Sequence, residues 1–167
     1  PELAGEWVSK VTAHSYDPRP LPVAQKSGAM VGMAMTEKQG GSDLRAVQTR
    51  AQPAESINGQ RIFALTGHKW FCSAPMSDGF FTLARDAAGV SCFFVPRSLP
   101  DGTRNNFLIQ RLKEKIGNRS NASSEIEYRD TLAWPVGEAG RGIATLIEMA
   151  HLTRFDIIVG VAGMMRA

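Results

Sequence analysis

Residues 33–43, MAMTEKQGGSD, set hydroxyl, carboxylate and glycine residues directly after an apolar run. The two adjacent glycines would let backbone N–H groups approach an anion without a Cβ in the way, and the hydroxyls of Thr36 and Ser42 can donate to oxygen acceptors. The stretch could therefore form a nest for a phosphate or for the polar edge of a ring. Residue types alone favour a simpler alternative, a Gly-Gly turn in which Asp43 caps the next segment. The sequence contains neither a P-loop pattern nor a G-x-G-x-x-G pattern.

A second stretch, GHKWFCSAP at residues 67–75, carries two adjacent aromatic residues. Alternation along a strand would place Trp70 and Phe71 on opposite faces, so that one ring could fill the core while the other forms a wall for a flat ligand. Ser73 would add a hydroxyl at the end of this strand. The alternative is an ordinary strand with core aromatics, in which His68 is a surface or hydrogen-bonded histidine.

A third stretch, KEKIGNRSNASSEIEYRD at residues 113–130, begins with several cations. Lys113, Lys115 and Arg119 could bind phosphate groups, although solvated charges bordering a strand are the more common case. The three histidines of the chain are far apart in sequence. A metal site is therefore not expected.

The elements that position these stretches are mainly strands from about residue 30 to residue 135. Apolar segments alternate with turn signals such as Asn58-Gly59 and Asp101-Gly102, which is typical of an all-β domain. In residues 123–130, Ile126 and Tyr128 alternate with charged residues, which predicts one buried face and one wet face. Roughly seven strands with this spacing indicate a barrel or a sandwich. The clearest segments are RIFALTG (61–67), GFFTLAR (79–85), VSCFFVP (90–96) and SSEIEYRD (123–130).

Both ends of the chain differ from this β pattern. Residues 1–27 end in a segment with Pro18, Pro20 and Pro22, which predicts an extended connector. From Ile143 onward the apolar spacing predicts a helix whose second half is apolar nearly all round. Such a helix is expected to be buried among further helices. The sequence is therefore expected to be a fragment of a larger protein.

Composition sets broad limits on the class of protein. The chain has 167 residues, of which 43% are hydrophobic and 21% are charged, as expected for one globular core. A net charge of +3 is too small to indicate nucleic-acid binding by itself. Cys72 and Cys92 lack metal-ligand spacing and are expected to be buried free thiols of a reducing compartment, with a disulfide as the alternative. No segment is typical of a signal peptide or a membrane span, so the cytoplasm is the expected location.

Together, the three stretches resemble the acyl-CoA dehydrogenase family. MTEKQGGSD resembles the family's Thr-Glu-x-x-x-Gly-Ser-Asp signature, and GHKWFCS resembles its Gly-x-Lys-x-Trp-Ile-Thr strand. KIGNRSNASSEIEYRDTLAW resembles the Lys-x-Gly-x-Arg-x-Ser segment, and VGEAGRGI resembles the entry to the first C-terminal helix. Within the family, the longest of these runs are similar to flavoproteins of the bacterial response to DNA alkylation. The resemblance extends from about residue 28 to the end of the chain.

This resemblance implies a division of the chain and a cofactor. Residues 1–27 would end an N-terminal helical domain and form its Pro-rich linker, residues 28–140 would be a flavin-binding β-barrel, and residues 141–167 would begin a C-terminal helical domain. The cofactor would be FAD, with Thr36 at the pyrimidine edge of the flavin ring, Ser42 toward the pyrophosphate, and both residues facing a substrate. The expected cofactor-binding residues are Met33, Ala34, Met35, Thr36, Glu37, Lys38, Gln39, Gly40, Gly41, Ser42, Phe71, Cys72 and Ser73.

The family's chemistry removes a proton beside a thioester carbonyl and passes a hydride to the flavin, which requires a carboxylate base. In some members this base is a Glu just before an Arg on the first C-terminal helix. Here Thr153 precedes Arg154, and Asp156 lies two positions beyond Arg154, about 200° around a helix from it, so Asp156 is expected to face elsewhere. The base is therefore expected outside this chain.

The resemblance also implies partners for the full-length protein. An acyl-CoA-like molecule is the expected substrate, and a homotetramer is the expected assembly. Similarity to the alkylation-response flavoproteins implies, as an alternative role, binding and protection of double-stranded DNA with little dehydrogenase activity.

Overall fold

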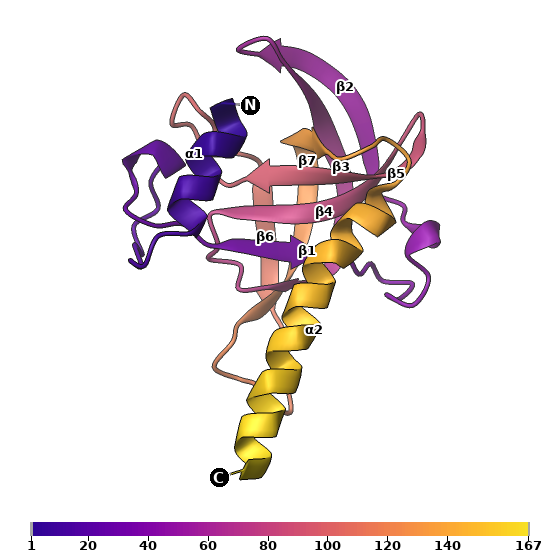
Figure 1. The fold of residues 1–167 in the computed structure, drawn as a ribbon. Helices are drawn as coiled ribbons and strands as arrows, with labels where there is room; N and C mark the ends of the chain where they lie inside the picture. The colour runs from indigo at the N-terminus through magenta and orange to yellow at the C-terminus, as the bar shows by residue number, and fades with distance from the viewer. Residues whose placement is uncertain (1, 167) are drawn as a thin grey trace.

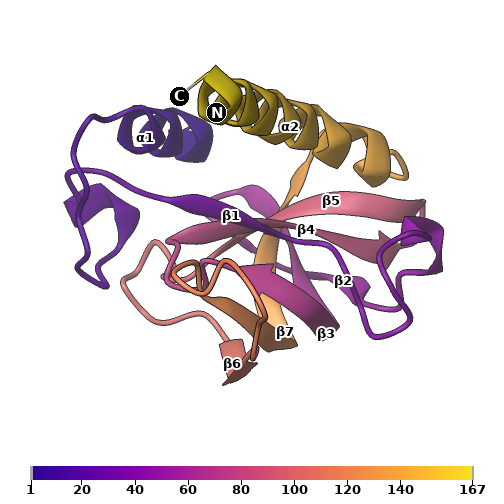
Figure 2. The same ribbon diagram turned by 90° about the horizontal axis from the view of Figure 1, so that it is seen from below.

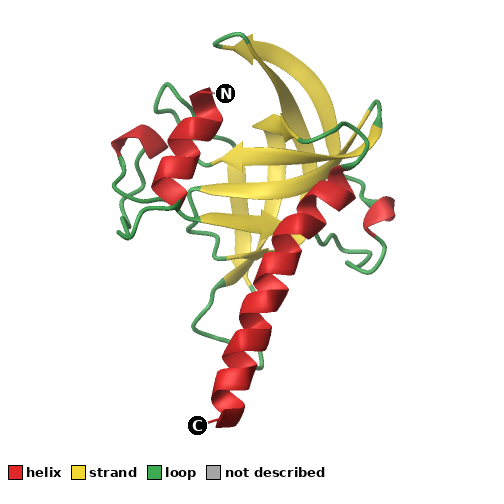
Figure 3. Cartoon of the chain, viewed as in Figure 1, coloured by secondary structure: helices red, strands yellow, loops and turns green. Residues whose placement is uncertain are grey.

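The computed structural model describes residues 2–166, with side chains described from residue 4 onward. The described residues form helix α1, seven strands and helix α2, together with two short 3-10 helices (Figure 1). Figure 3 shows the strands gathered in the centre of the molecule, as the sequence predicted for a mainly β chain. The element bounds are α1 Glu2–Val11, η1 Val23–Gln25, β1 Val31–Ala34, η2 Leu44–Ala46, β2 Arg50–Ile57, β3 Gln60–Ser73, β4 Gly79–Asp86, β5 Gly89–Pro96, β6 Phe107–Leu112, β7 Ser123–Val136 and α2 Gly142–Arg166.

Strand pairing decides between the barrel and the sandwich that the sequence left open. Neighbouring strands follow the order β4–β2–β3–β7–β5, and β5 pairs again with β4, which closes a ring. Strand β1 pairs in parallel with β4 outside this path, and β6 pairs with β7. The contact between β2 and β4 is a single register pair, Arg50 with Arg85. The fold is therefore a small barrel closed at one narrow point, with an extra strand at each side.

The turns follow from local sequence. Asn58 and Gly59 have φ values of 50° and 71°, and Ile57 pairs with Gln60 across them. Two successive positive φ values match the twist of an antiparallel hairpin, and Asn-Gly is the pair best able to adopt them. The predicted turn is confirmed, and it joins β2 and β3 as a hairpin.

The core confirms most of the predicted alternation. Ile126 and Tyr128 are buried, together with phenylalanines of β3, β4 and β5. The prediction that Glu125 lies on a wet face is wrong, because only 7% of this residue is exposed. Arg111 of β6 and Lys113, which directly follows β6, cover the Glu125 carboxylate. The negative charge of Glu125 is therefore buried together with positive charges that pair with it.

The two helices lie on the same side of the sheet formed by β1, β4 and β5 (Figure 2). Trp7 of α1 packs edge-on against Phe94 of β5, with ring centroids 4.7 Å apart. In α2, Leu146 is buried against the barrel, whereas Leu152, Phe155 and the apolar residues that follow are exposed. The predicted helix is confirmed, and its burial among further helices stays a prediction.

The predicted connector and the predicted free, buried state of the two cysteines agree with the structure. The Pro-rich segment forms an irregular connector that contains only η1. Cys72 and Cys92 are free and buried, and burial raises the pKa of each thiol to about 12. In residues 2–166, no helix has the length and apolarity to cross a bilayer.

Candidate functional site

The first two candidate stretches meet at the ends of β1 and β3. The backbone N–H of Trp70 donates to the carbonyl of Thr36 at 2.7 Å. Gly32 of β1 lies so close to the end of β3 that a Cβ on it would be 3.3 Å from the carbonyl oxygen of Ser73. Two segments that are separate in sequence thus form one continuous strip of backbone.

A buried ion pair joins the same two segments from inside the barrel. Lys69 Nζ donates to Glu37 Oε1 at 2.7 Å, and the two side chains are 0% and 5% exposed. Lys69 also donates to the carbonyl of Leu83 at 2.7 Å. Sequence reasoning missed this pair, although the alternation along β3 could have revealed that Lys69 falls on the core face.

Glu37 organises the loop that carries the glycines. Its carboxylate accepts the N–H and the hydroxyl of Thr49 at 3.1 and 2.6 Å, and the N–H of Gln48 at 2.7 Å. The side-chain amide of Gln39 donates a further hydrogen bond to the Glu37 carboxylate at 3.1 Å. The loop between Thr36 and Thr49 is therefore folded back on one buried carboxylate.

The charged state of this pair follows from its surroundings. Burial raises the pKa of the Glu37 carboxyl, but Lys69 and the donors of Thr49 and Gln48 outweigh burial and bring this pKa down to about 2. Burial lowers the pKa of the Lys69 ammonium to about 8, against the opposing effect of Glu37. Both groups are therefore charged at neutral pH.

Of the thirteen residues expected to bind the cofactor, three point their side chains inward. Ala34, Glu37 and Cys72 are buried, so these positions could offer only backbone atoms to a ligand. Met33 and Met35 are half-buried against the apolar cluster beneath α2. Their binding roles stay predictions.

Several of the other predicted residues are accessible. Phe71 is 45% exposed, and Ser73 at the end of β3 is exposed as well. Gly41 and Ser42 are exposed beside the half-buried Thr36. A Cβ on Gly41 would come within 2.6 Å of Thr36 Oγ1, so only glycine lets this backbone lie against the threonine. Lys38 and Gln39 are exposed and Gly40 is half-buried.

The prediction that one of the two aromatic rings fills the core is wrong. Trp70 is half-buried on the outer face, where Lys113 Nζ lies 3.1 Å from its ring centroid. A register irregularity between Lys69 and Cys72 breaks simple alternation, so Trp70 and Phe71 both face outward. The exposed Phe71 remains the candidate wall for a flat ligand.

The cations of the third stretch are not simply solvated. Lys113 pairs with Glu125 at 2.8 Å, and its side chain is only 9% exposed. Lys115 donates to the carbonyl of Asn121 and to Ser123 Oγ, and Arg119 donates to the carbonyl of Lys115 at 2.8 Å. These cations stabilise the loop that joins β6 to β7.

His68 is half-buried beside Trp70, with ring centroids 6.0 Å apart. Its Nε2 is shielded from solvent and has no hydrogen-bond partner within residues 2–166. Burial lowers the pKa of His68, and the nearby Lys38 adds to this effect. The imidazole is therefore neutral at pH 7, and the expectation of a surface or hydrogen-bonded histidine holds only in part.

Thr153 and Asp156 both lie in helix α2, as predicted, but the direction of Asp156 relative to Thr153 differs from the prediction. Thr153 Oγ1 donates to the carbonyl of Met149 at 3.3 Å, and both Thr153 and Asp156 are exposed. Residues three apart on a helix are neighbours on one side, so Asp156 faces away from Arg154 and not from Thr153. The expectation that Asp156 faces elsewhere is therefore wrong with respect to Thr153.

Comparisons with known proteins agree with this arrangement. The family model "Acyl-CoA dehydrogenase, middle domain" matches residues 32–131. The chain is 48% identical to AidB of Escherichia coli (strain K12) over 161 residues, which are 96% of this chain and 29% of AidB. It is 32% identical to acyl-CoA dehydrogenase family member 11 of Caenorhabditis elegans, over 81% of this chain and 23% of that protein. The chain thus spans less than a third of the length of these relatives.

Solved structures show the same fold. Caenorhabditis elegans ACDH-11, crystallised in complex with C11-CoA, superposes with a TM-score of 0.75 at 29% identity, over 92% of this chain and 26% of that one. An acyl-CoA dehydrogenase from Bacillus anthracis complexed with FAD has a TM-score of 0.58 at 21% identity, over 70% of this chain and 19% of that one. This second likeness concerns the fold alone. The family match, the identity to AidB and the barrel with its flanking strands show that the chain belongs to the acyl-CoA dehydrogenase family.

Proposed function

We propose that this chain is the flavin-binding barrel of an FAD-dependent oxidoreductase of the acyl-CoA dehydrogenase type. The observation that carries this proposal is the junction of β1 and β3, where the Thr36 carbonyl accepts the Trp70 N–H at 2.7 Å. That bond aligns the threonine and glycine loop with the exposed Phe71 and Ser73. FAD is the cofactor that the family membership supports.

The residues present fit such a group. Gly41, which has no Cβ, lets the backbone lie against Thr36 Oγ1, and the exposed Ser42 follows it. Phe71, 45% exposed, offers an apolar face of the kind that stacks on a flat ring. Thr36, Gly41 and Ser42 would hold the polar edge and the phosphates, and Phe71 and Ser73 would flank the ring. When bound, FAD would accept a hydride.

FAD retention by the full-length protein tests the assignment. We expect Thr36→Trp and Ser42→Trp to lower the flavin absorbance per protein strongly, because an indole would fill the space that the ligand needs. Ser56→Trp, on the exposed far end of the β2–β3 hairpin, is the matched control and should retain the flavin. A full-length protein that purifies without flavin and gains none from added FAD would contradict the proposal.

The expected reaction is oxidation at the CH–CH bond of an acyl-CoA-like substrate. Support comes from the ACDH-11 neighbour, which was solved with C11-CoA. The absence of a carboxylate directly before Arg154 favours low turnover on straight-chain acyl-CoA. Anaerobic bleaching of the flavin measures this turnover, and rapid bleaching by several chain lengths would show an ordinary dehydrogenase.

The second candidate is an AidB-like protein that binds double-stranded DNA as its main role, favoured by the 48% identity to AidB. In this chain, Arg111 and Lys113 pair with Glu125, and Arg129 pairs with Glu127, which leaves little free positive charge on the β6–β7 face. We therefore expect residues 1–167 to contribute little to phosphate binding. Tight, salt-sensitive retention of duplex DNA by these residues in a gel shift would contradict that expectation. A cytoplasmic homotetramer stays a prediction for the full-length protein.

A further inference from the structure

A pocket of about 210 Å³ lies between the Pro-rich connector and the strand ends on the α1 side of the barrel. Its apolar walls include Trp7, Met30 and the largely exposed Tyr16 and Met76. None of the thirteen residues assigned to the cofactor lines it. The pocket is therefore separate from the proposed flavin site.

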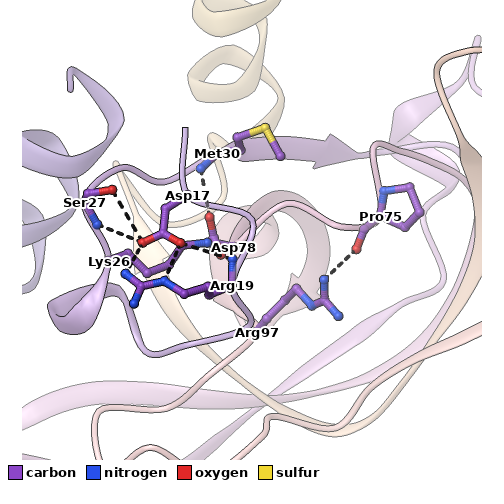
Figure 4. Close-up of polar contacts among 8 residues, drawn as sticks. All are labelled: Asp17, Arg19, Lys26, Ser27, Met30, Pro75, Asp78 and Arg97. Atoms are coloured by element: carbon purple, nitrogen blue, oxygen red, sulfur yellow. Dashed lines mark hydrogen bonds and ion pairs between the residues drawn. The ribbon is translucent and has the colours of Figure 1, made fainter. Parts of the chain in front are cut away.

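Two carboxylates hold the connector that forms one wall. Asp17 accepts from Arg19 Nη2 at 2.7 Å and from the Ser27 N–H at 3.1 Å (Figure 4). Asp78 accepts from Lys26 Nζ at 2.5 Å and from the Met30 N–H at 3.0 Å. Both carboxylates are thus fully engaged within the fold. They fix the wall and leave little negative charge to act on a ligand.

The charge balance of the lining is positive. Four cations and two carboxylates line the pocket, and the two carboxylates are paired with Arg19 and Lys26. Arg97 and Arg104 remain, and neither forms an ion pair with any residue in the described part of the chain. Two positive charges therefore face this space without a counter-ion.

Local structure keeps these two arginines together. Ser98 bridges to Arg104, and the Asn105 N–H donates to the Arg97 carbonyl at 2.9 Å, so the arginines sit on paired segments of one tight hairpin. Arg97 is half-buried, and one of its amino groups donates to the Pro75 carbonyl at 3.1 Å (Figure 4). Burial lowers the pKa of Arg97, and the charge of Arg104 lowers it further, whereas the charge of Asp78 acts in the opposite direction. The repulsion between the two arginines is what a bound anion would relieve.

We propose that this pocket binds the phosphate group of a small organic phosphate ester, with Arg97 and Arg104 on the phosphate oxygens and Tyr16 and Met76 against the organic part. Planar guanidinium groups match phosphate oxygens in pairs. Ser98 also lines the pocket, and its hydroxyl can donate a further hydrogen bond. The volume is suited to a phosphate with a ring-sized substituent, not to a whole dinucleotide.

The test measures binding of phenyl phosphate and of inorganic phosphate to the full-length protein, as purified, by calorimetry. We expect phenyl phosphate to bind more tightly than inorganic phosphate, and Arg104→Gln to weaken both about tenfold or more. Arg61→Gln removes an exposed arginine of β3 outside the pocket and should change neither affinity.

Two further variants keep the test decisive. Ser98→Glu adds a carboxylate to the lining of the pocket and should abolish phosphate binding while flavin content stays at the unmodified level. Arg97→Gln should also weaken phosphate binding, but it loses the hydrogen bond to the Pro75 carbonyl and could fail to fold. In that case Arg104→Gln and Ser98→Glu still report on the pocket. Phosphate affinities unchanged in both of these variants, or absent in the unmodified protein, would overturn the proposal.

Competition by coenzyme A and by dephospho-coenzyme A identifies the source of the phosphate. Displacement of phenyl phosphate by coenzyme A alone would assign the pocket to the phosphate monoester of an acyl carrier. Lack of displacement by either, with phenyl phosphate bound, would assign it to a separate organic phosphate. Both outcomes support a phosphate pocket, and neither depends on whether the flavin proposal holds.

Discussion

Two glutamates of the barrel pair with lysines across neighbouring segments, and they differ mainly in their surroundings. Glu37 and Lys69 meet at 2.7 Å with side chains 5% and 0% exposed. Glu125 meets Lys113 at 2.8 Å and Arg111 at 2.7 Å, but Arg111 is 63% exposed. The distances are nearly equal, so distance does not distinguish the two pairs.

The difference lies in what happens when one partner is removed. Water can solvate Arg111, so the loss of a bond there leaves a charge in a high-dielectric medium. The side chain of Lys69 is 0% exposed, so the loss of its partner leaves an unpaired charge inside the barrel. The pair of Glu37 and Lys69 therefore holds the loop from Thr36 to Thr49 in place. The pair of Glu125 and Arg111 contributes only to the surface of β6 and β7.

Lys69→Met should have the largest effect. It leaves the Glu37 carboxylate buried without its cation, and we expect a loss of about 3–5 kcal/mol in the free energy of unfolding. Chemical denaturation of the full-length protein measures it. The double variant Lys69→Met with Glu37→Gln removes both charges and should be less destabilised than Lys69→Met alone. Equal or additive losses would show that the pair is not coupled.

The second test is how the free energy of unfolding changes as the pH falls below 4.5. Because the pKa of Glu37 is held at about 2, below its ordinary value of 4.5, the folded state binds fewer protons there than the unfolded chain. The stabilisation is complete above pH 4.5 and is lost as pH falls toward 2. Glu125 shifts in the same direction, through its bonds to Arg111 and Lys113. The difference between the unmodified protein and Glu37→Gln should therefore shrink on acidification, and a constant difference would contradict this account.

Glu125→Gln should have an intermediate effect. It replaces the charged acceptor of Lys113, whose side chain is only 9% exposed, by a neutral amide oxygen, but Lys113 keeps its contact with the Trp70 ring at 3.1 Å. We expect a loss of about 1–2 kcal/mol, typical of a hydrogen bond to a charged group. Thermal unfolding followed by tryptophan fluorescence reports both the stability and the Trp70 environment. A loss as large as that of Lys69→Met would show that the two pairs are equivalent.

Arg111→Gln should have the smallest effect. The guanidinium is largely exposed, and Glu125 retains Lys113, so we expect a smaller loss of stability than for Glu125→Gln. Raising the salt concentration should reduce this loss further. A loss as large as that of Glu125→Gln, insensitive to salt, would mean that the pair of Arg111 and Glu125 also has a structural role.

Sequence reasoning was reliable for properties that depend on near neighbours. The Asn58-Gly59 hairpin and the helix from Gly142 follow from turn chemistry and periodicity, and both are confirmed. Motif order was sufficient to indicate the family. The errors concern Glu125 and Trp70, whose burial depends on what a distant segment places against them. Period-two alternation fails there because a register irregularity and a covering strand change which faces are wet.

By itself, the sequence determined the mainly β class, the turns and the final helix, which follow from local propensity and from residue types at short spacing. The two stretches expected to flank a flavin were indicated by the resemblance to a family, and not by their residue types alone. Only the tertiary structure decided that the strands close into a barrel, that Glu37 and Lys69 meet inside it, and that Arg97 and Arg104 share a pocket without a counter-ion. Burial and pairing arise between segments far apart in the chain, and a residue's charge has its structural meaning only once its neighbours in space are known.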